Sequence, residues 1–410
     1  MLSYQEAVEV VLQTVQPLSS VEMALPEALG LVLAEPAVAC WDLPPADNSA
    51  MDGYAFAWNG QGEGSLLEVV GFVPAGSHFD KPVPPGQAVK IMTGAPLPGG
   101  CDSVVPVEEV AAESTHIRLL RAPRAGQHVR RRGEELQRGE SLLGAGMPLH
   151  AGEMGLLAAA GIERVRVYPA PRVALLSTGD ELVELGEMPG PGQIVNSNFH
   201  LLAARLKEEG ATVVSLGVAR DNEYDLSERI GRGLQADMLI STGGVSVGDR
   251  DHVQETLRAH GFQLGFWKVS IKPGKPVLFG TVKGRPVFGL PGNPAAAAAT
   301  FELFVRPALR WLAGFPGPLQ PRLRAKLTAG IDGGEKRQRF IWGSLQEREG
   351  RFEFVPSARQ GSGQNRSLQA VQALLPVAGG HTGLAAGDEV EVMLVRMPPG
   401  HFREQDKGIR

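Results

Sequence analysis

A glycine-rich loop in the second half of the chain has residue types that suit the binding of an oxyanion. The loop Ser241–Gly244 follows the apolar strand end Met238–Ile240 and precedes a helix predicted to start near Asp251. Unpaired backbone N–H groups at a helix start bind oxyanions, and small glycines allow a close approach. The loop lacks the Gly-Lys-Ser/Thr of a P-loop and the GxGxxG of a dinucleotide fold. Taken alone, it is equally consistent with an ordinary strand-to-helix turn.

Two further loops follow predicted strands in the same way. Ser177–Glu181 reads Ser-Thr-Gly-Asp-Glu and places two carboxylates after the run RVALLS. Gly289–Pro294 ends another strand, with Asn293 placed to cap a helix and Pro294 in its first turn. Ligands of open α/β sheets bind outside the carboxyl ends of the strands. Capping alone could explain each loop, but the three together indicate one crevice.

Positive charge is expected beside this crevice. Lys272 and Lys275 lie in the segment Ile271–Pro276, where two prolines stiffen the loop and hold the ammonium groups three residues apart. Such lysines would neutralise a bound anion. A lysine pair is also typical of a solvated loop, but this loop precedes the strand PVLFG of the same predicted sheet.

Polar segments in the first half of the chain suit a hard cation. Asp47 and Asp52 are spaced along DNSAMDGYA, and Thr93 lies in the Gly/Pro-bounded turn IMTGAP. Spaced carboxylates are suitable ligands for Mg²⁺, which often bridges to a substrate phosphate. An Asx-turn is the alternative explanation. The charge run Arg130–Glu135 is by itself typical of a solvated surface.

The elements that position these loops fall into three kinds of sequence. Apolar residues at helical spacing predict an amphipathic helix before Pro17 and a short second helix at Leu25–Leu33. From Cys40 to Gly139, short β-rich runs such as LLEVVGFV, QAVKIM, SVVPVEEV and HIRLL predict a separate β domain. After the linker GFPGPLQP, period-two segments predict a small C-terminal β domain.

Between these two β regions, strands alternate with helices of about ten residues. A helical segment at Ala151–Gly161 comes first. The predicted strands are RVALLS, TVVSLGVA, DMLIS, FWKVSI, PVLFGTV and PVFGLPG, and the predicted helices are Asn198–Glu209, Tyr224–Leu234, Asp251–His260 and Pro294–Leu312. This alternation predicts a parallel sheet that is covered on both faces.

Composition limits the classes of protein and partner. The chain has 410 residues with a net charge of −5, which gives no general reason to bind nucleic acid or an anionic membrane. Its 52 glycines and 31 prolines indicate a folded chain with many turns. The spacing of Cys40 and Cys101 fits no metal motif, and the amino terminus resembles no signal peptide. We therefore expect a cytoplasmic protein that does not span a membrane.

Eight ordered motifs resemble those of the molybdopterin molybdenumtransferases, the molybdenum insertase family that includes the E domain of gephyrin. They are DNSAMDGYA, IMTGAPLP, RRRGEE, STGDEL, IVNSN, STGGVSVG, IKPGKP and GLPGNP. The resemblance covers essentially the whole chain. It implies the insertion of molybdenum from molybdate into adenylylated molybdopterin, with Mg²⁺-dependent release of AMP. Molybdopterin adenylyltransferase and molybdoenzymes are possible partners that such a family suggests.

The resemblance also implies an elongated homodimer of four-domain subunits, with the active cleft between the molybdopterin-binding domain of one subunit and the β domain of the other. The fold class is a multidomain α/β plus β protein with a parallel-sheet molybdopterin-binding domain and separate β-rich domains. We expect a discontinuous helical linker domain at 20–39 and 140–167, a β-rich domain at 40–139, a molybdopterin-binding α/β domain at 1–19 and 168–314, and a C-terminal β domain at 315–410.

Matching motif by motif assigns functional residues. The candidate catalytic residues are Asp52, Thr93, Glu135, Glu181, Asp221, Asp251, Lys272 and Lys275, with Asp52 and Glu181 as the expected Mg²⁺ ligands. The candidate substrate-binding residues are Ser177, Thr178, Gly179, Asp180, Ser241, Gly243, Gly244, Ser246, Gly248, Pro291, Gly292, Asn293 and Pro294, together with Ser362 and Ser367 of GSGQNRSL.

Two positions depart from the family pattern. Glu135 replaces an aspartate, and Trp342 stands where the family commonly has arginine, which removes one cation from the expected cleft rim. Two other functions stay open from the sequence. A molybdopterin adenylyltransferase normally consists of the α/β domain alone and lacks DNSAMDGYA, while a gephyrin-like scaffold without turnover would not need the acidic and lysine motifs.

Overall fold

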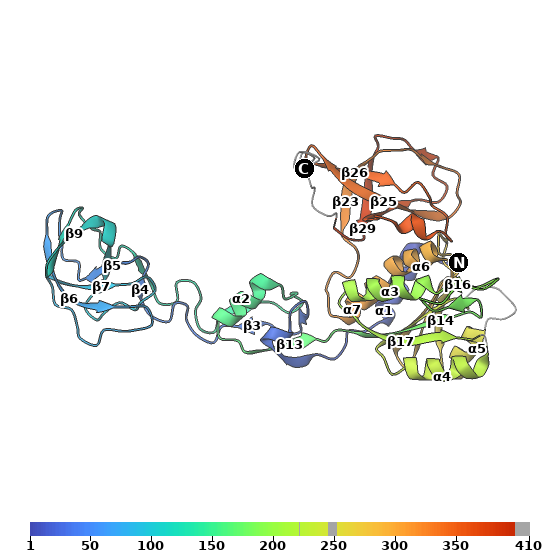
Figure 1. The fold of residues 1–410 in the computed structure, drawn as a ribbon, viewed down its shortest axis with the longest axis horizontal. Helices are drawn as coiled ribbons and strands as arrows, with labels where there is room; N and C mark the ends of the chain where they lie inside the picture. The colour runs from blue at the N-terminus through green and yellow to red at the C-terminus, as the bar shows by residue number, and fades with distance from the viewer. Residues whose placement is uncertain (221, 245–251, 398–410) are drawn as a thin grey trace. The chain divides into compact units, whose positions relative to one another are not determined.

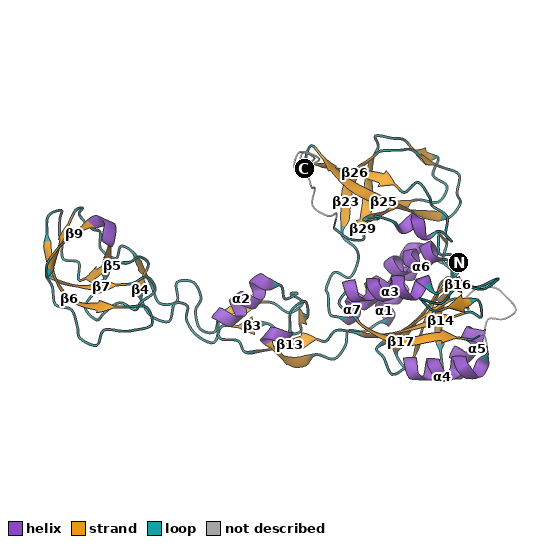
Figure 2. Cartoon of the chain, viewed as in Figure 1, coloured by secondary structure: helices purple, strands orange, loops and turns teal. Residues whose placement is uncertain are grey.

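The computed structural model describes residues 1–220, 222–244 and 252–397, and the chain divides into two compact units (Figures 1 and 2). The first unit combines Met1–Val21 with Tyr168–Arg410, and the second is Glu22–Val167. Among the described residues, no helix is long and apolar enough to cross a membrane.

A six-stranded sheet forms the centre of the first unit. Its strand order is β17-β14-β18-β22-β21-β19. The bounds are β14 Arg172–Thr178, β17 Thr212–Ala219, β18 Met238–Thr242, β19 Gln263–Trp267, β21 Leu278–Val282 and β22 Arg285–Leu290. Four strands are parallel, as the alternation of strands and helices predicts, whereas β21 and β19 are antiparallel to their neighbours, which the sequence analysis did not predict. Only Lys283 and Gly284, both at positive φ, join β21 to β22, and a two-residue hairpin can only reverse the chain.

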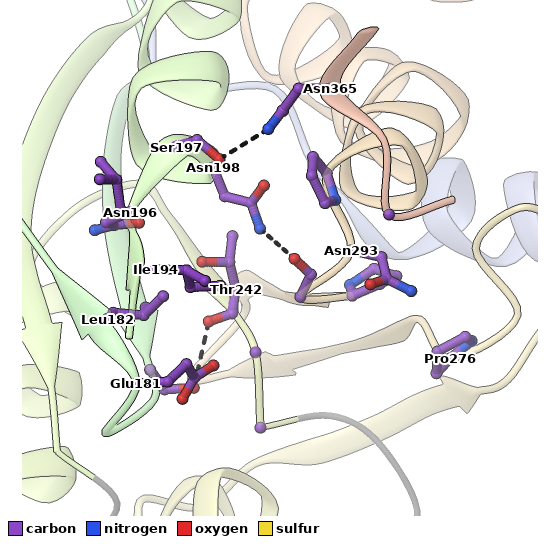
Figure 3. Close-up of a pocket in the computed structure, with 18 residues that line it drawn as sticks. Glu181, Leu182, Ile194, Asn196, Ser197, Asn198, Thr242, Pro276, Asn293 and Asn365 are labelled. Carbon is purple, nitrogen blue, oxygen red and sulfur yellow. Dashed lines mark hydrogen bonds between the residues drawn. The ribbon is translucent and has the colours of Figure 1, made fainter. Parts of the chain in front are cut away.

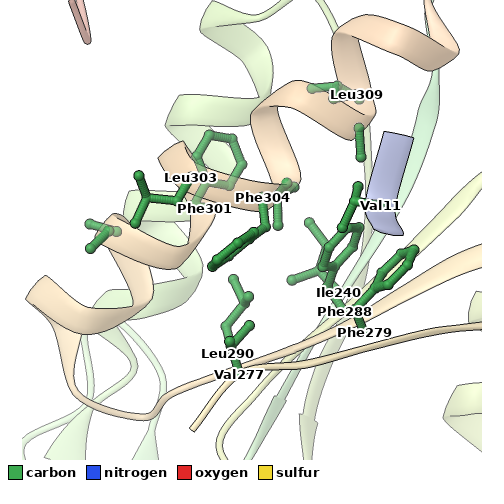
Figure 4. Packing of buried hydrophobic residues seen from close by; sticks show 14 of the residues in the cluster. Val11, Ile240, Val277, Phe279, Phe288, Leu290, Phe301, Leu303, Phe304 and Leu309 are labelled. Atoms are coloured by element: carbon green, nitrogen blue, oxygen red, sulfur yellow. The ribbon is translucent and has the colours of Figure 1, made fainter. Parts of the chain in front are cut away.

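Helices cover both faces of this sheet, as predicted (Figure 1). On one face, buried residues of α1, α3 and the segment 294–312 pack against Val173 and Leu175 of β14. On the other face, α4 and α5 pack against Ala174 and Leu176 of the same strand. Figure 4 shows Phe301 and Phe304 packed above Phe279 and Phe288 of the sheet. The helix bounds are α1 Tyr4–Thr14, α3 Ser197–Glu208, α4 Glu223–Gly233, α5 His252–Ala259, α6 Pro294–Thr300 and α7 Arg306–Leu312, with a π-helical turn Phe301–Val305 between α6 and α7.

A buried ionic cluster joins α3 to the π-helical turn. The Glu302 side chain is 3% exposed, and its carboxylate accepts a 2.8 Å hydrogen bond from Arg205 Nε and lies 3.4 Å from an Arg306 nitrogen. Burial raises the pKa of Glu302, and the two arginine charges oppose that shift. Glu209 also contacts both arginines. The cluster therefore fixes the spacing between α3 and the segment 294–312, whose starts both reach the pocket described below.

We expect Glu302→Gln to lower the free energy of unfolding by about 3 kcal/mol, because it leaves two buried arginines short of a counter-charge. Urea denaturation measures the change. The matched control is Glu208→Gln, since the Glu208 side chain is 52% exposed although it pairs with the same Arg205. That variant should lose less than about 1 kcal/mol. Equal losses in the two variants would show that burial of the Glu302 charge is unimportant.

The C-terminal part of the first unit is a second six-stranded sheet. Its order is β20-β25-β26-β23-β29-β27. The bounds are β20 Ile271–Lys272, β23 Arg322–Leu327, β25 Gln338–Arg348, β26 Arg351–Pro356, β27 Ala373–Val377 and β29 Glu389–Leu394, with a short pair β24 Ile331–Asp332 and β28 Gly383–Leu384. The prediction that period-two segments form a β domain here is confirmed. Strand β20 joins this sheet beside β25, so the lysine loop that follows it is anchored to the C-terminal part.

The second unit contains the predicted β-rich region. Its six-stranded sheet has the order β8-β5-β7-β6-β10-β9 and buried apolar clusters on both faces. The bounds are β5 Gly53–Phe56, β6 Leu66–Val73, β7 Gln87–Ile91, β8 Ser103–Pro106, β9 Val110–Glu113 and β10 His116–Leu119, with the short pairs β4 Asn48–Ser49 with β11 Val129–Arg130 and β3 Ala37–Val38 with β12 Ser141–Leu143.

A smaller cluster in the same unit combines helix α2, Ala151–Ala159, with the three-stranded sheet β1-β13-β2. The bounds are β1 Val21–Ala24, β2 Val32–Leu33 and β13 Arg164–Tyr168. Helix α2 was predicted, but the helix predicted at Leu25–Leu33 is wrong. A 3₁₀ turn covers only Leu25–Glu27, and Gly30 at φ 80° then turns the chain into β2.

Candidate functional site

A pocket of about 700 Å³ lies in the first unit, beyond the carboxyl ends of β14, β18 and β22 (Figure 3). All three predicted loops and the C-terminal part contribute to it. Its lining residues are Thr178, Glu181, Leu182, Ile194, Val195, Asn196, Ser197, Asn198, Thr242, Gly243, Gly244, Pro276, Pro291, Gly292, Asn293, Pro294, Gly363 and Asn365. The prediction that these strand ends share one crevice is therefore confirmed.

Strand ends β14 and β18 form the floor through buried hydroxyl groups. Thr178 Oγ1 donates to the Thr242 carbonyl oxygen at 3.3 Å. Thr242 Oγ1 donates to Ser177 Oγ at 3.3 Å, and Ser177 Oγ donates to Asn196 Oδ1 at 3.0 Å. Ser177 and Ser241 are buried and do not line the pocket, although the sequence suggested that they contact the substrate. Both side chains lie behind the residues that line the pocket floor.

The loop after β18 can approach β14 only because it contains two glycines. Gly243 has φ 85°, and a Cβ there would lie 2.5 Å from the Thr178 carbonyl oxygen. Gly244 has φ 61°, and its Cβ would lie 2.5 Å from a Val253 methyl group. Both positions combine left-handed backbone with close contact, so a side chain would force the loop away from the strand. Glycine here fixes the shape of the pocket floor.

Glu181 is the one charged residue among the described residues that line the pocket. Its carboxylate folds back over Gly179, where a Cβ would lie 2.4 Å from Oε2. The next residue begins the short parallel pair β15, Leu182–Val183, and β16, Ile194–Val195, which supplies an aliphatic wall. Asp180 is exposed and does not line the pocket.

The start of α3 contributes amide side chains that the site prediction missed. Asn196 is 2% exposed and caps the helix, and Asn198 Nδ2 donates to the Gly292 carbonyl oxygen at 2.7 Å (Figure 3). Asn196 Nδ2 and Asn198 Oδ1 are buried without a hydrogen-bond partner among the described residues. Asparagines directly before a predicted helix were a signal for capping, but no sequence pattern shows that they face a pocket.

Ser362 of the C-terminal part forms hydrogen bonds with residues at the start of α6. Pro294 occupies the first turn as predicted, but the Asn293 side chain does not cap the helix and instead donates to Ser362 Oγ at 3.3 Å. The Ser362 carbonyl oxygen accepts the Ala295 N–H at 2.9 Å. The N–H groups of the first turn are thus partly used within the protein. They position the loop rather than present an open anion site.

The turn 361–365 of the C-terminal part reaches the pocket and holds its own shape. Ser367 is fully buried, and its hydroxyl donates to the Gly361 carbonyl oxygen at 3.3 Å. Asn365 Nδ2 donates to Ser197 Oγ at 3.4 Å (Figure 3). Ser362 and Ser367 therefore act on the turn, while Gly363 and Asn365 line the pocket. Asn365 was missed because its partner lies 168 residues away.

The two lysines of the KPGK loop have different environments. Lys272 Nζ lies 2.5 Å from Glu335 Oε2, and this hydrogen bond holds the pKa of Glu335 below its ordinary value. Lys275 is exposed and forms no ion pair with the described residues. Gly274, at φ 98° against Thr300, permits the turn between them. Neither lysine lines the pocket, but Pro276 of the same loop does.

In the second unit, Asp52 and Thr93 lie together. Asp52 Oδ1 accepts hydrogen bonds from Thr93 Oγ1 and from the Thr93 N–H, both at 2.7 Å. The hydroxyl bond, followed by the backbone bond, lowers the pKa of Asp52. Glu135 is exposed.

The charge run of the second unit is largely paired. Arg131 and Arg132 form 2.6 Å ion pairs with Asp47 and Asp42. These pairs fit the expectation of a solvated surface for this run.

Each expected Mg²⁺ ligand stands as a single carboxylate among the described residues. No three acidic, histidine or cysteine side chains of the described residues gather as a metal site. Mg²⁺ needs only one or two protein carboxylates when substrate phosphates supply other ligands. Asp52 fits that role, because it is exposed and its hydrogen bonds with Thr93 use only Oδ1. Glu181 is exposed as well, and it is the single carboxylate among the described residues that line the pocket, so each expected ligand would bring one protein carboxylate to the metal.

Trp342 occupies the position of an expected arginine but does not reach solvent. It is 2% exposed within the apolar core, and Gln360 binds both its backbone N–H and its carbonyl oxygen, at 3.1 and 2.8 Å. Four predicted site residues, Asp221, Ser246, Gly248 and Asp251, lie outside the described residues.

Comparison with known families places each part of the chain. Residues 2–161 match the MoeA N-terminal region (domain I and II), residues 174–311 a probable molybdopterin binding domain, and residues 324–395 the MoeA C-terminal region (domain IV). With the pocket at the strand ends, this combination defines a multidomain transferase of molybdenum cofactor biosynthesis.

Relatives that match most of the chain are molybdopterin molybdenumtransferases. The chain is 40% identical to a molybdopterin molybdenumtransferase of Nostoc over 89% of its length and 86% of that protein, and 34% identical to molybdopterin molybdenumtransferase 2 of Mycobacterium tuberculosis over 96% and 99%. A crystal structure of a molybdopterin biosynthesis MoeA protein from Pyrococcus horikosii matches with a TM-score of 0.82 at 30% identity, covering 97% of this chain and all of that one. The chain belongs to the MoeA family of molybdopterin molybdenumtransferases, which insert molybdenum into molybdopterin.

Thr93→Val should raise the pKa of Asp52 toward its ordinary value, because valine removes the hydroxyl donor and leaves the backbone donor. Since the folded pKa is depressed, the Asp52–Thr93 contact is present at neutral pH and is lost as the pH falls through the folded pKa. Carboxyl ¹³C NMR titration measures the shift. Thr115→Val, in the same unit, is the control. An unchanged Asp52 titration in Thr93→Val would contradict the assignment.

Proposed function

We propose that the chain transfers molybdenum from molybdate to adenylylated molybdopterin and cleaves its phosphoanhydride, with release of AMP. The observation that carries the proposal is the 700 Å³ pocket, because it gathers the loops after three strands and a turn of the C-terminal part around one space. A pocket of this size suits a pterin nucleotide. The exposed Lys275, on the loop that supplies Pro276, fits an anion at the pocket margin.

The reaction brings anions together, so charge must be shielded. Molybdate exchanges oxo groups for dithiolene sulfurs, and the substrate also carries phosphates. Lys275 is suited to this shielding because no ion pair with described residues competes for it, whereas Lys272 is already paired with Glu335. Lys272 therefore positions the loop, through Glu335 and the β20–β25 pairing, and Lys275 meets the anion.

Mg²⁺ is part of the proposal. When bound, it would neutralise charge on the phosphoanhydride and act as a Lewis acid. Asp52 would be its carboxylate from the protein, held in place by the two bonds from Thr93. Ionised Asp52 is favoured at neutral pH by those bonds.

The active site is proposed to combine two chains of a cytoplasmic homodimer. The support is the family resemblance, together with the separation of Asp52 and Lys275 into different units of the chain. The β-rich region of one chain would supply Asp52 to the pocket of the other. Molybdopterin adenylyltransferase and molybdoenzymes would deliver the substrate and receive the product.

Lys275→Gln should weaken molybdate-dependent AMP release about two- to fivefold at subsaturating molybdate, since an exposed ion pair contributes up to about 1 kcal/mol. The assay mixes purified protein, adenylylated molybdopterin, molybdate and Mg²⁺ and follows AMP. Lys283→Gln, at an exposed hairpin, is the matched control and should behave as wild type. Melting temperatures should stay unchanged. Absence of molybdate-dependent AMP release in wild type would refute the proposed function, and an unaltered Lys275→Gln would refute the role of this lysine.

Mixing Asp52→Asn chains with Lys275→Gln chains should restore activity if each site uses both units from different chains. A heterodimer would then contain up to one intact site. The measurement is AMP release after subunit exchange, which mass spectrometry verifies. Verified exchange without recovery of activity would rule out the two-chain site.

A further inference from the structure

The pocket of the first unit has an unusual balance of charge for a site whose substrate carries phosphates. Among its described lining residues there is one carboxylate, Glu181, and there is no cation. A phosphate placed against Glu181 would meet like charge without compensation. The exposed cation Lys275 belongs to the loop that supplies Pro276, and Figure 3 shows Glu181 and Pro276 on opposite sides of the pocket. The Glu181 side therefore suits a neutral part of the substrate that offers N–H donors.

Glu181 is exposed and supplies two carboxylate oxygens to that side. Asn198 is held in place by the 2.7 Å bond from its Nδ2 to the Gly292 carbonyl oxygen, and its Oδ1 is buried. Asn196 Nδ2 is likewise buried without a hydrogen-bond partner among the described residues. The acceptor that a ligand can reach on that side is therefore the Glu181 carboxylate.

The walls suit a flat ring. Leu182 and Ile194 of the β15–β16 pair are aliphatic, and Pro291 and Pro294 are further apolar lining residues. Flat heterocycles bind well between aliphatic surfaces that carry a few polar groups. The substrate of the proposed function has two such rings, a pterin and an adenine, and their hydrogen-bonding edges differ.

A carboxylate distinguishes these rings. The 2-amino-4-oxopyrimidine edge of a pterin has two adjacent donors, the 2-amino group and N3–H, which match the two acceptor oxygens of a carboxylate. The corresponding edge of adenine has one donor beside one acceptor, and that acceptor nitrogen would face a carboxylate oxygen. The donor pattern therefore favours the pterin.

We propose that Glu181 binds the 2-amino and N3–H edge of the pterin, and that the phosphate and molybdate end of the substrate lies toward Pro276 and Lys275. The inference rests on the proposed function for the identity of the substrate. It gives Glu181 a recognition role in place of the Mg²⁺ ligation that the sequence suggested, and it sets the orientation of the substrate in the pocket.

The test is equilibrium binding of phosphate-free ligands to the full-length protein, without molybdate or Mg²⁺. The probes are 6-hydroxymethylpterin, its 2-deaminated analogue 6-hydroxymethyllumazine, and adenosine, followed by fluorescence or calorimetry. Wild type should bind the pterin about tenfold or more tightly than the lumazine, because the lost donor leaves a charged acceptor unpaired. Glu181→Gln should weaken pterin binding by about tenfold or more and abolish this discrimination. Glu184→Gln, an exposed carboxylate that does not line the pocket, should match wild type.

Three results would overturn the inference. They are no pterin binding by wild type at millimolar concentration, equal pterin affinity of wild type and Glu181→Gln, or a loss in Glu181→Gln that affects adenosine instead of the pterin. The AMP-release assay on wild type keeps the two proposals apart. Molybdate-dependent AMP release with pterin binding that is independent of Glu181 would leave the proposed function standing and reject only the pterin subsite. A lack of AMP release would reject the proposed function while the binding data still decide the subsite.

Discussion

The close approach of the loop after β18 to the end of β14 is the contact on which the pocket depends. Gly243 and Gly244 adopt left-handed backbone where side chains would collide with Thr178 and Val253. The Thr178 hydroxyl then binds the Thr242 carbonyl, and the buried chain of hydroxyls continues through Ser177 to the cap of α3. One backbone conformation thus fixes both the floor and the helix that carries Asn198. Because the hydroxyls of this chain are buried and hydrogen-bonded to one another, small displacements at the glycines would be felt at the amide side chains.

The second constraint is the separation of charge. The deep ionic cluster around Glu302 balances three arginines with three glutamates away from the pocket lining. It holds α3 and the segment 294–312 together, and the start of each reaches the pocket. Among the described residues, the lining has a single carboxylate, and Lys275, which pairs with none of them, lies outside it. Such an arrangement separates a region for hydrogen-bonded recognition from a region for anions.

The sequence predicted what depends on local chemistry and missed what depends on distant partners. Glycine loops after apolar runs, the proline at the start of α6 and the period-two strands of the C-terminal part were all found, because each is determined by neighbouring residues. The antiparallel direction of β21 was not predicted, although the pair Lys283-Gly284 between two apolar runs is typical of a hairpin. The pairing of Lys272 with Glu335 and of Asn365 with Ser197 joins residues 63 and 168 positions apart, which no local pattern reveals.

The same distinction explains why a motif can be recognised correctly while the role of one of its residues remains a proposal. STGDEL identifies a loop at a strand end, and the structure confirms where the loop lies. What a carboxylate does there depends on its surroundings, since a hard cation favours several oxygen anions and a donor-rich ring favours an isolated acceptor pair. Glu181 has the second kind of surroundings among the described residues, with amides and aliphatic side chains about it. Asp52, exposed and fixed by Thr93, has the first kind available to it once a phosphate is present. Our proposal that these two carboxylates bind different parts of one substrate rests on this difference in surroundings.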